Sequence, residues 1–221
     1  MTTQLLQKNT LLNIISHYIP DNPIIIEAGA FDGRDTRKLS RQWPCGTIHT
    51  FEPVPDIFAL LKKNTTSLSH VHCYNIALSE KTGTTVFYIS EKPNKPGQPF
   101  QAGSLHKPQK RLSFSDVQYK KTIHVQTITI DDWAKQYGVN HVDFLWLDMQ
   151  GHELHVLKAA PHILKTIKVI YTEVNFGQAY ENQYTYEQVK QWLEKRNFQE
   201  IGRDFIDQKQ WFFGNVLFVK K

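Results

Sequence analysis

The amino-acid sequence predicts an α/β fold, a mainly parallel β-sheet with helices on both faces, in a single domain over residues 1–221. A length of 221 residues is enough for one medium α/β domain and short for two. Hydrophobic residues make up 40% and charged residues 21%, which is a globular composition and excludes a largely disordered chain. Segments with helical periodicity alternate with short apolar runs, and this alternation favours a parallel sheet covered on both faces.

The first half of the chain begins with an expected amphipathic N-terminal helix over residues 4–18, where apolar residues recur at about helical spacing. Residues 23–28 form a short apolar run between a proline-containing turn and a glycine turn, as a buried strand does. The elements expected next are helix 32–43, strand 47–51, a helix whose start is set by Pro53 and Pro55, and strand 71–78.

The second half contains two segments, 84–90 and 122–128, in which apolar and polar side chains alternate, and this predicts an antiparallel pair of strands. Thr185 and Gln188 form a capping-box pattern that predicts the start of a helix ending near residue 197. The other expected elements are helix 129–137, strand 142–147, a helix from His152, strand 168–174, and a closing hairpin of strands 198–205 and 211–219 around Asp207 and Gln208.

The positive charge is concentrated in one segment. The chain has 26 Lys and Arg against 21 Asp and Glu, a formal net charge of +5, which fits either a nucleic-acid-binding protein or a mildly basic enzyme. Residues 91–121 contain seven basic and two acidic residues, a surplus of +5, together with four prolines and no long apolar period. We expect 91–121 to be a basic loop insertion, and such long loops are usually functional or disordered.

Signals for targeting or for a disulfide framework are missing. No stretch approaches the roughly 20 apolar residues that a membrane helix requires, and no secretory signal is visible at the N-terminus. Cys45 and Cys73 are too few for a disulfide framework and lack the paired spacing of a zinc site. We expect a cytoplasmic protein without a membrane span.

The first expected strand runs into the sequence Glu-Ala-Gly-Ala-Phe-Asp-Gly over residues 27–33. Glycines in such a turn allow a ligand to approach the backbone, because glycine lacks a Cβ atom. Gly29 and Gly33 have the spacing Gly-x-x-x-Gly, whereas the dinucleotide fingerprint is Gly-x-Gly-x-x-Gly, which argues against a bound pyrophosphate. A tight turn whose glycines serve only geometry is the other open interpretation.

Polar residues follow the next strands, and ligands of parallel α/β sheets bind at these carboxyl ends. Glu52 lies about 20 residues beyond the glycine turn, where a carboxylate can accept hydrogen bonds from both hydroxyls of a ribose. It can equally be a helix N-cap. Asn75 can read the edge of an adenine or satisfy the end of its own strand.

Two further carboxylates are expected at the same edge. Asp148 follows four apolar residues, and a carboxylate there is costly unless it is paired, hydrogen-bonded or metal-bound, which favours a functional role. Glu173 ends the next strand, so the two groups are expected to converge on one cleft. Hard oxygen ligands suit Mg²⁺, which makes the pair a candidate site for a divalent cation.

Together these motifs resemble the FkbM-type S-adenosylmethionine-dependent methyltransferases. Each motif is short, but their joint order and spacing are specific, and the resemblance covers roughly residues 24–219. The matching segments are Glu27–Gly33, Phe51–Pro53, Asn64, Asn75–Ala77 with Gly83, Gly103–Leu105, Thr129–Asp132, Asp143–Glu153, Glu173 and Asn215–Phe218.

The resemblance implies the class I methyltransferase (Rossmann-like) fold, with a mainly parallel seven-stranded sheet and an antiparallel C-terminal hairpin. It implies S-adenosylmethionine as the cofactor and O-methylation of a hydroxyl on a sugar or other small-molecule acceptor. The residues that it assigns to cofactor binding are Glu27, Gly29, Ala30, Phe31, Gly33, Glu52, Pro53, Asn75, Ile76, Ala77, Ser104, Asp148 and Met149.

The resemblance and the strand-end geometry assign roles within this set. Glu52 is assigned to the ribose, Glu27 to the methionine ammonium, and Asn75 to the adenine. The residues expected to act in catalysis are Asp148, His152 and Glu173. Asp148 either accepts from the amino group or acts as the base, and His152 offers an imidazole, the side chain best suited to proton transfer near neutral pH.

The chain departs from the family pattern at four positions. The usual Asp is Glu27, the usual Asn is Phe31, the usual Lys is Trp146 and the usual Glu is Gln150. A catalytically inactive S-adenosylmethionine-binding module therefore stays open. A nucleic-acid methyltransferase stays open because of the basic segment, although the Asn/Asp-Pro-Pro-Tyr/Phe signature of base-amino methylases is absent. A dehydrogenase is the remaining alternative.

Ser104 lies inside the basic segment, at the Gly-Ser-Leu position of the family. We therefore expect 91–121 to close over the cofactor and acceptor as a lid. Its charge would then select an anionic small-molecule or glycan acceptor. A merely solubilising loop is the competing interpretation.

Overall fold

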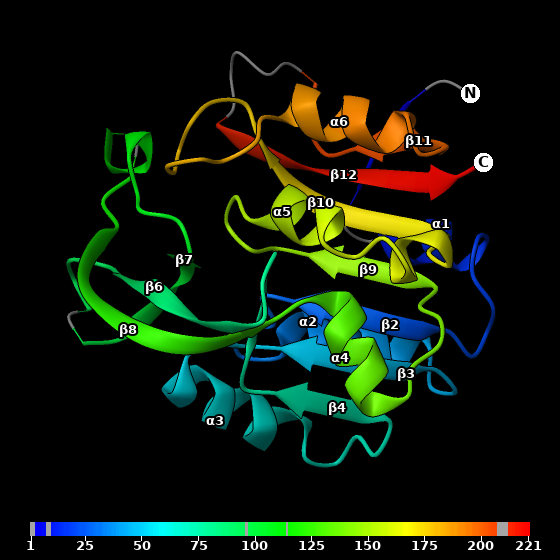
Figure 1. Ribbon diagram of the computed structural model, residues 1–221, viewed down its shortest axis with the longest axis horizontal. Coiled ribbons are helices and arrows are strands. Elements are labelled where there is room, and N and C mark those ends of the chain that lie inside the picture. Colours follow the sequence, from blue (N-terminus) through cyan, green and yellow to red (C-terminus); the bar gives the residue numbers. More distant parts are fainter. Residues whose placement is uncertain (1–2, 8–9, 96, 114, 207–211) are drawn as a thin grey trace.

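The computed structural model describes residues 3–7, 10–95, 97–113, 115–206 and 212–221, and these form two β-sheets with helices packed against the larger one (Figure 1). The larger sheet has eight strands in the order β1-β11-β12-β10-β9-β2-β3-β4. These strands are β1 (Gln4–Leu5), β2 (Ile24–Ala28), β3 (Thr47–Phe51), β4 (Val71–Tyr74), β9 (Phe144–Leu147), β10 (Val169–Asn175), β11 (Phe198–Arg203) and β12 (Phe213–Lys220).

The pairing of these strands confirms the predicted mainly parallel sheet with an antiparallel C-terminal hairpin. β12 runs antiparallel to both β10 and β11, and the other neighbouring pairs are parallel. Strand 47–51 has the predicted bounds. β1 is an eighth strand, beyond the seven that were expected.

Both faces of the sheet are covered by helices, as predicted. Ile25 and Phe144 pack on one face with α1 (Leu11–Ser16) and α2 (Arg34–Gln42). Their chain neighbours Ile26 and Leu145 belong to the core on the other face, because successive strand residues point to opposite sides. This second core includes residues of α4 (Ile130–Tyr137), α5 (Glu153–Lys158) and α6 (Tyr186–Glu194), and α3 (Pro55–Thr65) connects β3 to β4. α6 begins with the predicted capping box.

The prediction of a helix over residues 4–18 is wrong for its first half. Gln4 and Leu5 form β1, which pairs in parallel with the edge strand β11, and the amide of Leu6 donates to the Arg203 carbonyl over 2.7 Å. Helix α1 starts only at Leu11. The free edge of β11 offers hydrogen-bond partners that the local sequence does not reveal, and this tertiary pairing overrides the helical periodicity.

The prediction of a loop insertion over residues 91–121 is wrong in part, because strands occupy 99–104 and 118–121. A second sheet has the order β5-β8-β6-β7 and consists of β5 (Ala77–Leu78), β6 (Gly83–Glu91), β7 (Pro99–Ser104) and β8 (Gln118–Ile128). The predicted antiparallel pair is confirmed as β6 and β8, but both strands reach into the segment. Pro99 opens β7, an edge strand, where a missing amide proton costs little.

The expected strand 71–78 is divided between the two sheets. β4 stays in the larger sheet and β5 pairs with β8. At the break, Asn75 Nδ2 donates to the backbone carbonyls of Glu52 (2.9 Å) and Pro53 (3.0 Å), which fixes the point where the chain leaves β4. The Asp207–Gln208 turn expected in the closing hairpin lies outside the described residues.

Within the described ranges, none of the helices has the length and apolar character needed to cross a bilayer.

Candidate functional site

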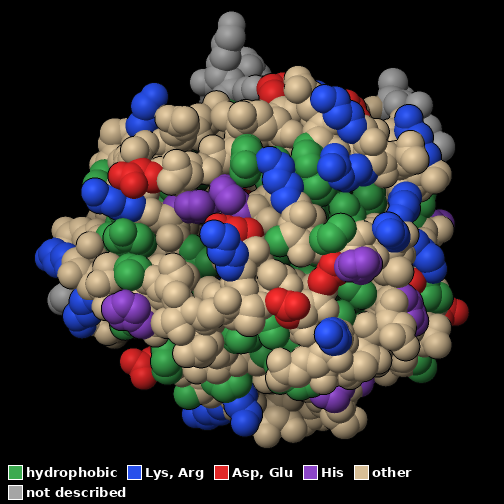
Figure 2. All heavy atoms as spheres, in the orientation of Figure 1, with side chains coloured by type: hydrophobic (Ala, Val, Ile, Leu, Met, Phe, Trp, Pro, Cys, Tyr) green, Lys and Arg blue, Asp and Glu red, His purple; other side chains and the backbone are tan. Residues whose placement is uncertain are grey.

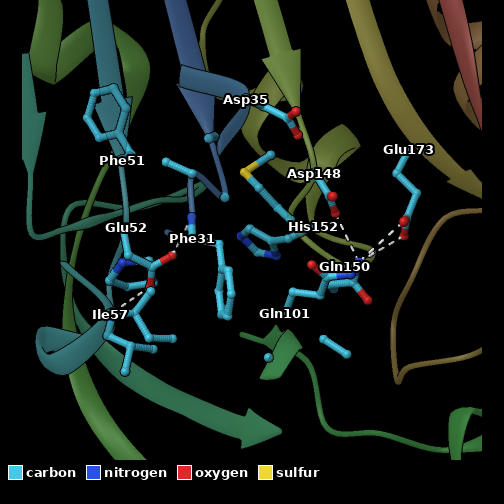
Figure 3. A pocket seen from close by; sticks show the side chains of 18 of the residues that line it. Phe31, Asp35, Phe51, Glu52, Ile57, Gln101, Asp148, Gln150, His152 and Glu173 are labelled. Carbon is cyan, nitrogen blue, oxygen red and sulfur yellow. Dashed lines mark hydrogen bonds between the residues drawn. The ribbon is translucent and has the colours of Figure 1, made fainter. Parts of the chain in front are cut away.

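A cavity of about 590 Å³ lies at the carboxyl ends of β2, β3 and β9, with residues of β10 at one end. In Figure 1 the arrowheads of β3, β4 and β9 point toward the second sheet, and residues of β6 and β7 form the opposite wall of the cavity. Figure 3 shows its two ends: Glu52, Phe31 and Ile57 lie at one, and Asp148 and Glu173 at the other. The volume is within the range of about 300–1,000 Å³ typical of small-molecule sites.

The glycines of the first turn are required by packing within the protein. Gly29 has φ +85°, and a Cβ atom there would lie 1.8 Å from the backbone oxygen of Asp148. Gly33 has φ +78°, and a Cβ atom would lie 2.8 Å from Leu61 Cδ1 on α3. Gly29 and Ala30 line the cavity, whereas Gly33 is buried away from its wall. For Gly33, the structure therefore favours the interpretation that the glycine serves the geometry of the turn and not the approach of a ligand.

Glu52 faces the cavity with a fixed orientation. Its two carboxylate oxygens accept hydrogen bonds from the backbone amides of Phe31 (3.1 Å) and Val54 (2.8 Å). Each oxygen keeps a further lone pair, so the group can accept from two hydroxyls of a ligand. Burial raises the pKa of Glu52 to about 7. Phe31 has φ +48°, a conformation that non-glycine residues seldom adopt, and Pro53 also lines the cavity.

The segment after β4 contributes apolar surface. Ile76, Ala77 and Leu78 line the cavity beside Glu52. Asn75 is not among the lining residues, because its amide nitrogen bonds the backbone at Glu52 and Pro53. The structure thus brings Ile76 and Ala77, but not Asn75, to the cavity wall.

Glu27 lies behind the cavity. It is 1% exposed, and its Oε2 accepts from the hydroxyls of Thr36 (2.6 Å) and Thr50 (2.8 Å). Burial raises the pKa of Glu27 to about 7. Since Glu27 is not among the lining residues, its position does not favour direct contact with a ligand ammonium.

Asp148 and Glu173 converge as expected, and Gln150 joins them (Figure 3). Gln150 Nε2 donates to Asp148 Oδ1 over 2.9 Å and to the two Glu173 oxygens over 3.2 and 3.3 Å. Asp148 is exposed to the cavity, whereas Glu173 is buried and 7% exposed. Desolvation raises the pKa of Asp148, and desolvation with the charges of Asp148 and Glu153 raises the pKa of Glu173 well above its usual range.

This arrangement does not fit a magnesium ion between the two carboxylates. The position that a shared cation would take is occupied by the Gln150 amide nitrogen. This group is a hydrogen-bond donor, and its positively polarised N–H hydrogens cannot bind a cation. Gln150 Oε1 is itself engaged by the Tyr180 hydroxyl over 3.0 Å, which fixes the amide in this orientation.

His152 borders the cavity, but its imidazole has other partners. Nδ1 lies 2.9 Å from His106 Nε2, and Nε2 lies 3.1 Å from Ser79 Oγ and 2.9 Å from Glu80 Oε2. Because both ring nitrogens are engaged away from Asp148, the position of His152 does not favour a role as general base.

Two further predicted residues support the site. Met149 lines the cavity, and its amide donates to Glu153 Oε1 over 2.8 Å. Ser104 is fully buried beside the wall, and its hydroxyl donates to the Gln150 carbonyl over 3.0 Å. Ser104 therefore connects β7 to the loop after β9.

Sequence reasoning missed the residues at the Asp148 end. Trp146 and Tyr171 occupy paired positions on β9 and β10, with ring centroids 4.6 Å apart, and both line the cavity. The alternation of strand residues was the signal that could have found Trp146, since it faces the same side as Phe144. Asp35 and Lys38 also line the cavity, and no local pattern identified them, whereas Arg111 belongs to the basic segment 91–121 whose charge was expected to select the acceptor.

The comparisons agree with this architecture. The family described as "Methyltransferase FkbM domain" matches residues 27–200. 2-O-methyltransferase NoeI of Sinorhizobium fredii (strain NBRC 101917 / NGR234) is 29% identical over 171 residues, covering 77% of this chain and 70% of NoeI. Hexuronic acid methyltransferase AglP of Haloferax volcanii is 27% identical over 131 residues, covering 59% of this chain and 48% of AglP. The matches thus span from about half to about seven tenths of these relatives.

Solved structures show the fold. M. capricolum TrmK in complex with S-adenosylhomocysteine superposes with a TM-score of 0.51 at 9% identity, covering 99% of this chain and 70% of TrmK. Magnesium protoporphyrin IX methyltransferase of Synechocystis PCC 6803 with bound S-adenosylmethionine gives 0.52 at 9% identity, covering 96% and 77%. These likenesses confirm the class I methyltransferase (Rossmann-like) fold.

The Gln150 bridge predicts a pH-dependent loss of stability in Gln150→Glu. An ionised glutamate at position 150 cannot donate to Asp148 and Glu173. The three neighbouring carboxyl groups of the folded variant must therefore keep a proton up to a higher pH than they do in the unfolded chain. The variant's stability deficit should therefore be small below about pH 4.5, the unfolded pKa, and grow as pH rises, reaching about 1–3 kcal/mol at pH 8. Thermal denaturation at pH 4.5 and 8 measures this. Gln101→Glu, an exposed change at the same cavity, is the control, and equal deficits at both pH values would contradict the bridge.

Proposed function

The chain belongs to the FkbM methyltransferase domain family, and from this premise we propose that it transfers a methyl group from S-adenosylmethionine to a hydroxyl group of a sugar-like acceptor in the 590 Å³ cavity. The observation that carries the proposal is the Glu52 carboxylate, which is oriented by two backbone amides and keeps lone pairs for the two ribose hydroxyls. The relatives named as a 2-O-methyltransferase and a hexuronic acid methyltransferase support oxygen as the methylated atom.

The residues of the Glu52 end fit the cofactor. Ile57 and Ile76–Leu78 offer apolar surface for a purine beside the ribose site, and Gly29 and Ala30 bring backbone close to the middle of the cavity. When bound, S-adenosylmethionine supplies an electrophilic methyl group on a sulfonium. The positive sulfonium is favoured near the carboxylate end of the cavity, where Asp148 lies.

Asp148 is the proposed base. Its carboxylate is open to the cavity, and burial raises its pKa, which makes it a better proton acceptor for an acceptor hydroxyl. Glu173 is more deeply enclosed, and burial together with the charge of Asp148 raises its pKa well above the usual range. Gln150 orients both groups, so its amide compensates for the glutamate usual in the family. We therefore favour an active enzyme over an inactive binding module.

The Asp148 end also fits a sugar-like acceptor. Trp146 and Tyr171 form an aromatic surface against which the apolar face of a sugar ring can pack, and Asn215 and Asp35 add polar groups for its hydroxyls. Arg111 lies close enough to favour the ionised forms of Asp148 and Glu173. A negatively charged acceptor such as a uronic acid is the finer proposal, because the Arg111 guanidinium can bind a carboxylate.

The structure does not place the seven basic residues of segment 91–121 together around the cavity, as attraction of an anionic acceptor by all seven would require. Lys107 pairs with Glu181 (3.7 Å) and Lys121 with Glu91 (3.6 Å), and Lys92 lies over the Phe100 ring. Figure 2 shows Lys and Arg side chains spread over the visible face among Asp and Glu. Of the seven cations, only Arg111 is among the residues lining the described cavity, so we favour a small acceptor over a nucleic acid.

The ribose assignment predicts a pH-dependent affinity. The pKa of Glu52 is about 7, and ribose hydroxyls donate to its ionised form. Affinity for S-adenosylmethionine should therefore be greatest above pH 7 and fall by up to about tenfold per pH unit below it, because binding must release the proton. Glu52→Gln should bind at least about tenfold more weakly at pH 8 and lose this pH dependence. Calorimetric titration from pH 6 to 8 measures both.

Glu181→Gln, which changes an exposed carboxylate, is the matched control and should behave as the parent. Parent-like affinity and parent-like pH dependence of Glu52→Gln would refute the ribose site.

The acceptor assignment predicts two distinct kinetic effects. Trp146→Ala should raise the KM of neutral and anionic sugar acceptors alike, by about tenfold, since both lose the packing surface. Arg111→Gln should raise the KM of a uronic acid by about tenfold or more and leave that of a neutral hexoside nearly unchanged. Methyl transfer to matched acceptors measures these constants, with Lys107→Gln as the control. Equal effects of Arg111→Gln on both acceptors would contradict an anion-binding role.

A further inference from the structure

A second cavity of about 340 Å³ lies on the other side of His152 from the main cavity. Its lining includes Glu80 before β6, His106 after β7, and His152 and His155 at the start of α5. None of these groups is used by the proposed methyl transfer.

The three imidazoles are arranged around a common point. One nitrogen each of His106, His152 and His155 lies within 4.8 Å of the others. The rings of His152 and His155 are stacked with centroids 4.8 Å apart, and the ring of His106 lies 4.7 Å from the first and 4.8 Å from the second. One nitrogen of each ring thus lies near a shared volume, and the His155 ring, which is stacked nearly parallel on that of His152, must rotate to direct its lone pair there.

The partners of His152 determine which of its nitrogens carries the lone pair. Its Nε2 lies 2.9 Å from Glu80 Oε2, a geometry in which the ring donates its proton to the carboxylate. The lone pair is then on Nδ1, which faces His106 Nε2 at 2.9 Å. A carboxylate that receives the outer N–H of an imidazole is the usual support of a histidine that binds a metal through its other nitrogen.

His155 supplies an independent observation. Its Nδ1 is buried and has no hydrogen-bond partner among the described residues, although a buried polar atom without a partner costs about 1–3 kcal/mol. A metal ion between the rings would satisfy this nitrogen. Zinc–nitrogen bonds of about 2.0–2.1 Å place two ligands about 3.3 Å apart. The facing nitrogens of His106 and His152, 2.9 Å apart, must therefore separate by a few tenths of an ångström, and His155 must move closer, because the three ligand nitrogens are spread over up to 4.8 Å.

We propose that His106, His152 and His155 bind a divalent transition-metal ion of the Zn²⁺ class, with a water molecule completing four-coordination and Glu80 orienting His152. Three neutral imidazoles suit Zn²⁺ or Co²⁺, whereas Mg²⁺ prefers oxygen ligands. The ion links the end of β7 to the start of α5, directly after the loop that holds Asp148 and Gln150. It thereby fastens the second sheet to the catalytic edge of the first and takes no part in the methyl transfer itself.

The test uses the full chain without a polyhistidine tag. After dialysis against a chelator, the protein is titrated with Zn²⁺ by calorimetry and with Co²⁺ by visible spectroscopy. The proposal predicts saturable binding of one ion per chain, the intense visible absorption of four-coordinate Co²⁺, and a raised melting temperature with Zn²⁺.

His106→Gln and His155→Gln should each weaken Zn²⁺ binding at least about tenfold, with far-UV circular dichroism confirming that the variants fold. His162→Gln removes an exposed histidine elsewhere and should leave binding unchanged. Glu80→Gln should weaken binding less than loss of a ligand does. Absence of saturable binding in the parent, or equal binding by the parent and both ligand variants, would overturn the proposal. Since Zn²⁺ binding is measured without methyl transfer, the result stands apart from the proposed enzymatic function.

Discussion

The amide of Gln150 is the interaction on which the site depends. Its nitrogen donates to Asp148 and to Glu173, which fixes the two carboxyl groups relative to one another at one end of the cavity. Its oxygen accepts from the Tyr180 hydroxyl. The backbone of Gln150 has φ +53°, an unfavourable conformation for a non-glycine residue, and the surrounding hydrogen bonds must offset that cost. An amide is both donor and acceptor in one planar group, as these partners require.

The same residue sets the position of the second sheet. Ser104 on β7 donates to the Gln150 carbonyl. The Tyr180 hydroxyl, whose single proton is directed to Gln150 Oε1, also lies 3.1 Å from the Ala102 carbonyl on β7. The wall of the cavity and its carboxylates are therefore placed relative to one another through Gln150. Because a small displacement of reacting groups costs much rate, this coupling explains how a segment with basic, proline-rich composition contributes to a catalytic edge as an ordered strand.

The sequence predicted the features that follow from hydrophobic periodicity and from the ends of strands. It did not predict the features that depend on tertiary contacts. Glu52 and Asp148 could be predicted because parallel strands bring their carboxyl ends to one edge. β1 could not, because a strand of two residues exists only through its pairing with β11. Asn75 has the expected position, but its amide binds backbone, an orientation that no pattern encodes. His106 escaped notice because its partners His152 and His155 come from a distant segment of the chain.

The central claim is that one cavity holds the cofactor at the Glu52 end and the reacting oxygen at the Asp148 end. The most direct measurement is a crystal structure of the protein with S-adenosylhomocysteine. The account predicts both ribose hydroxyls within hydrogen-bond distance of Glu52, and the sulfur directed toward Asp148 and the aromatic pair Trp146 and Tyr171. A ribose bound away from Glu52, or a sulfur directed away from the Asp148 end, would contradict it.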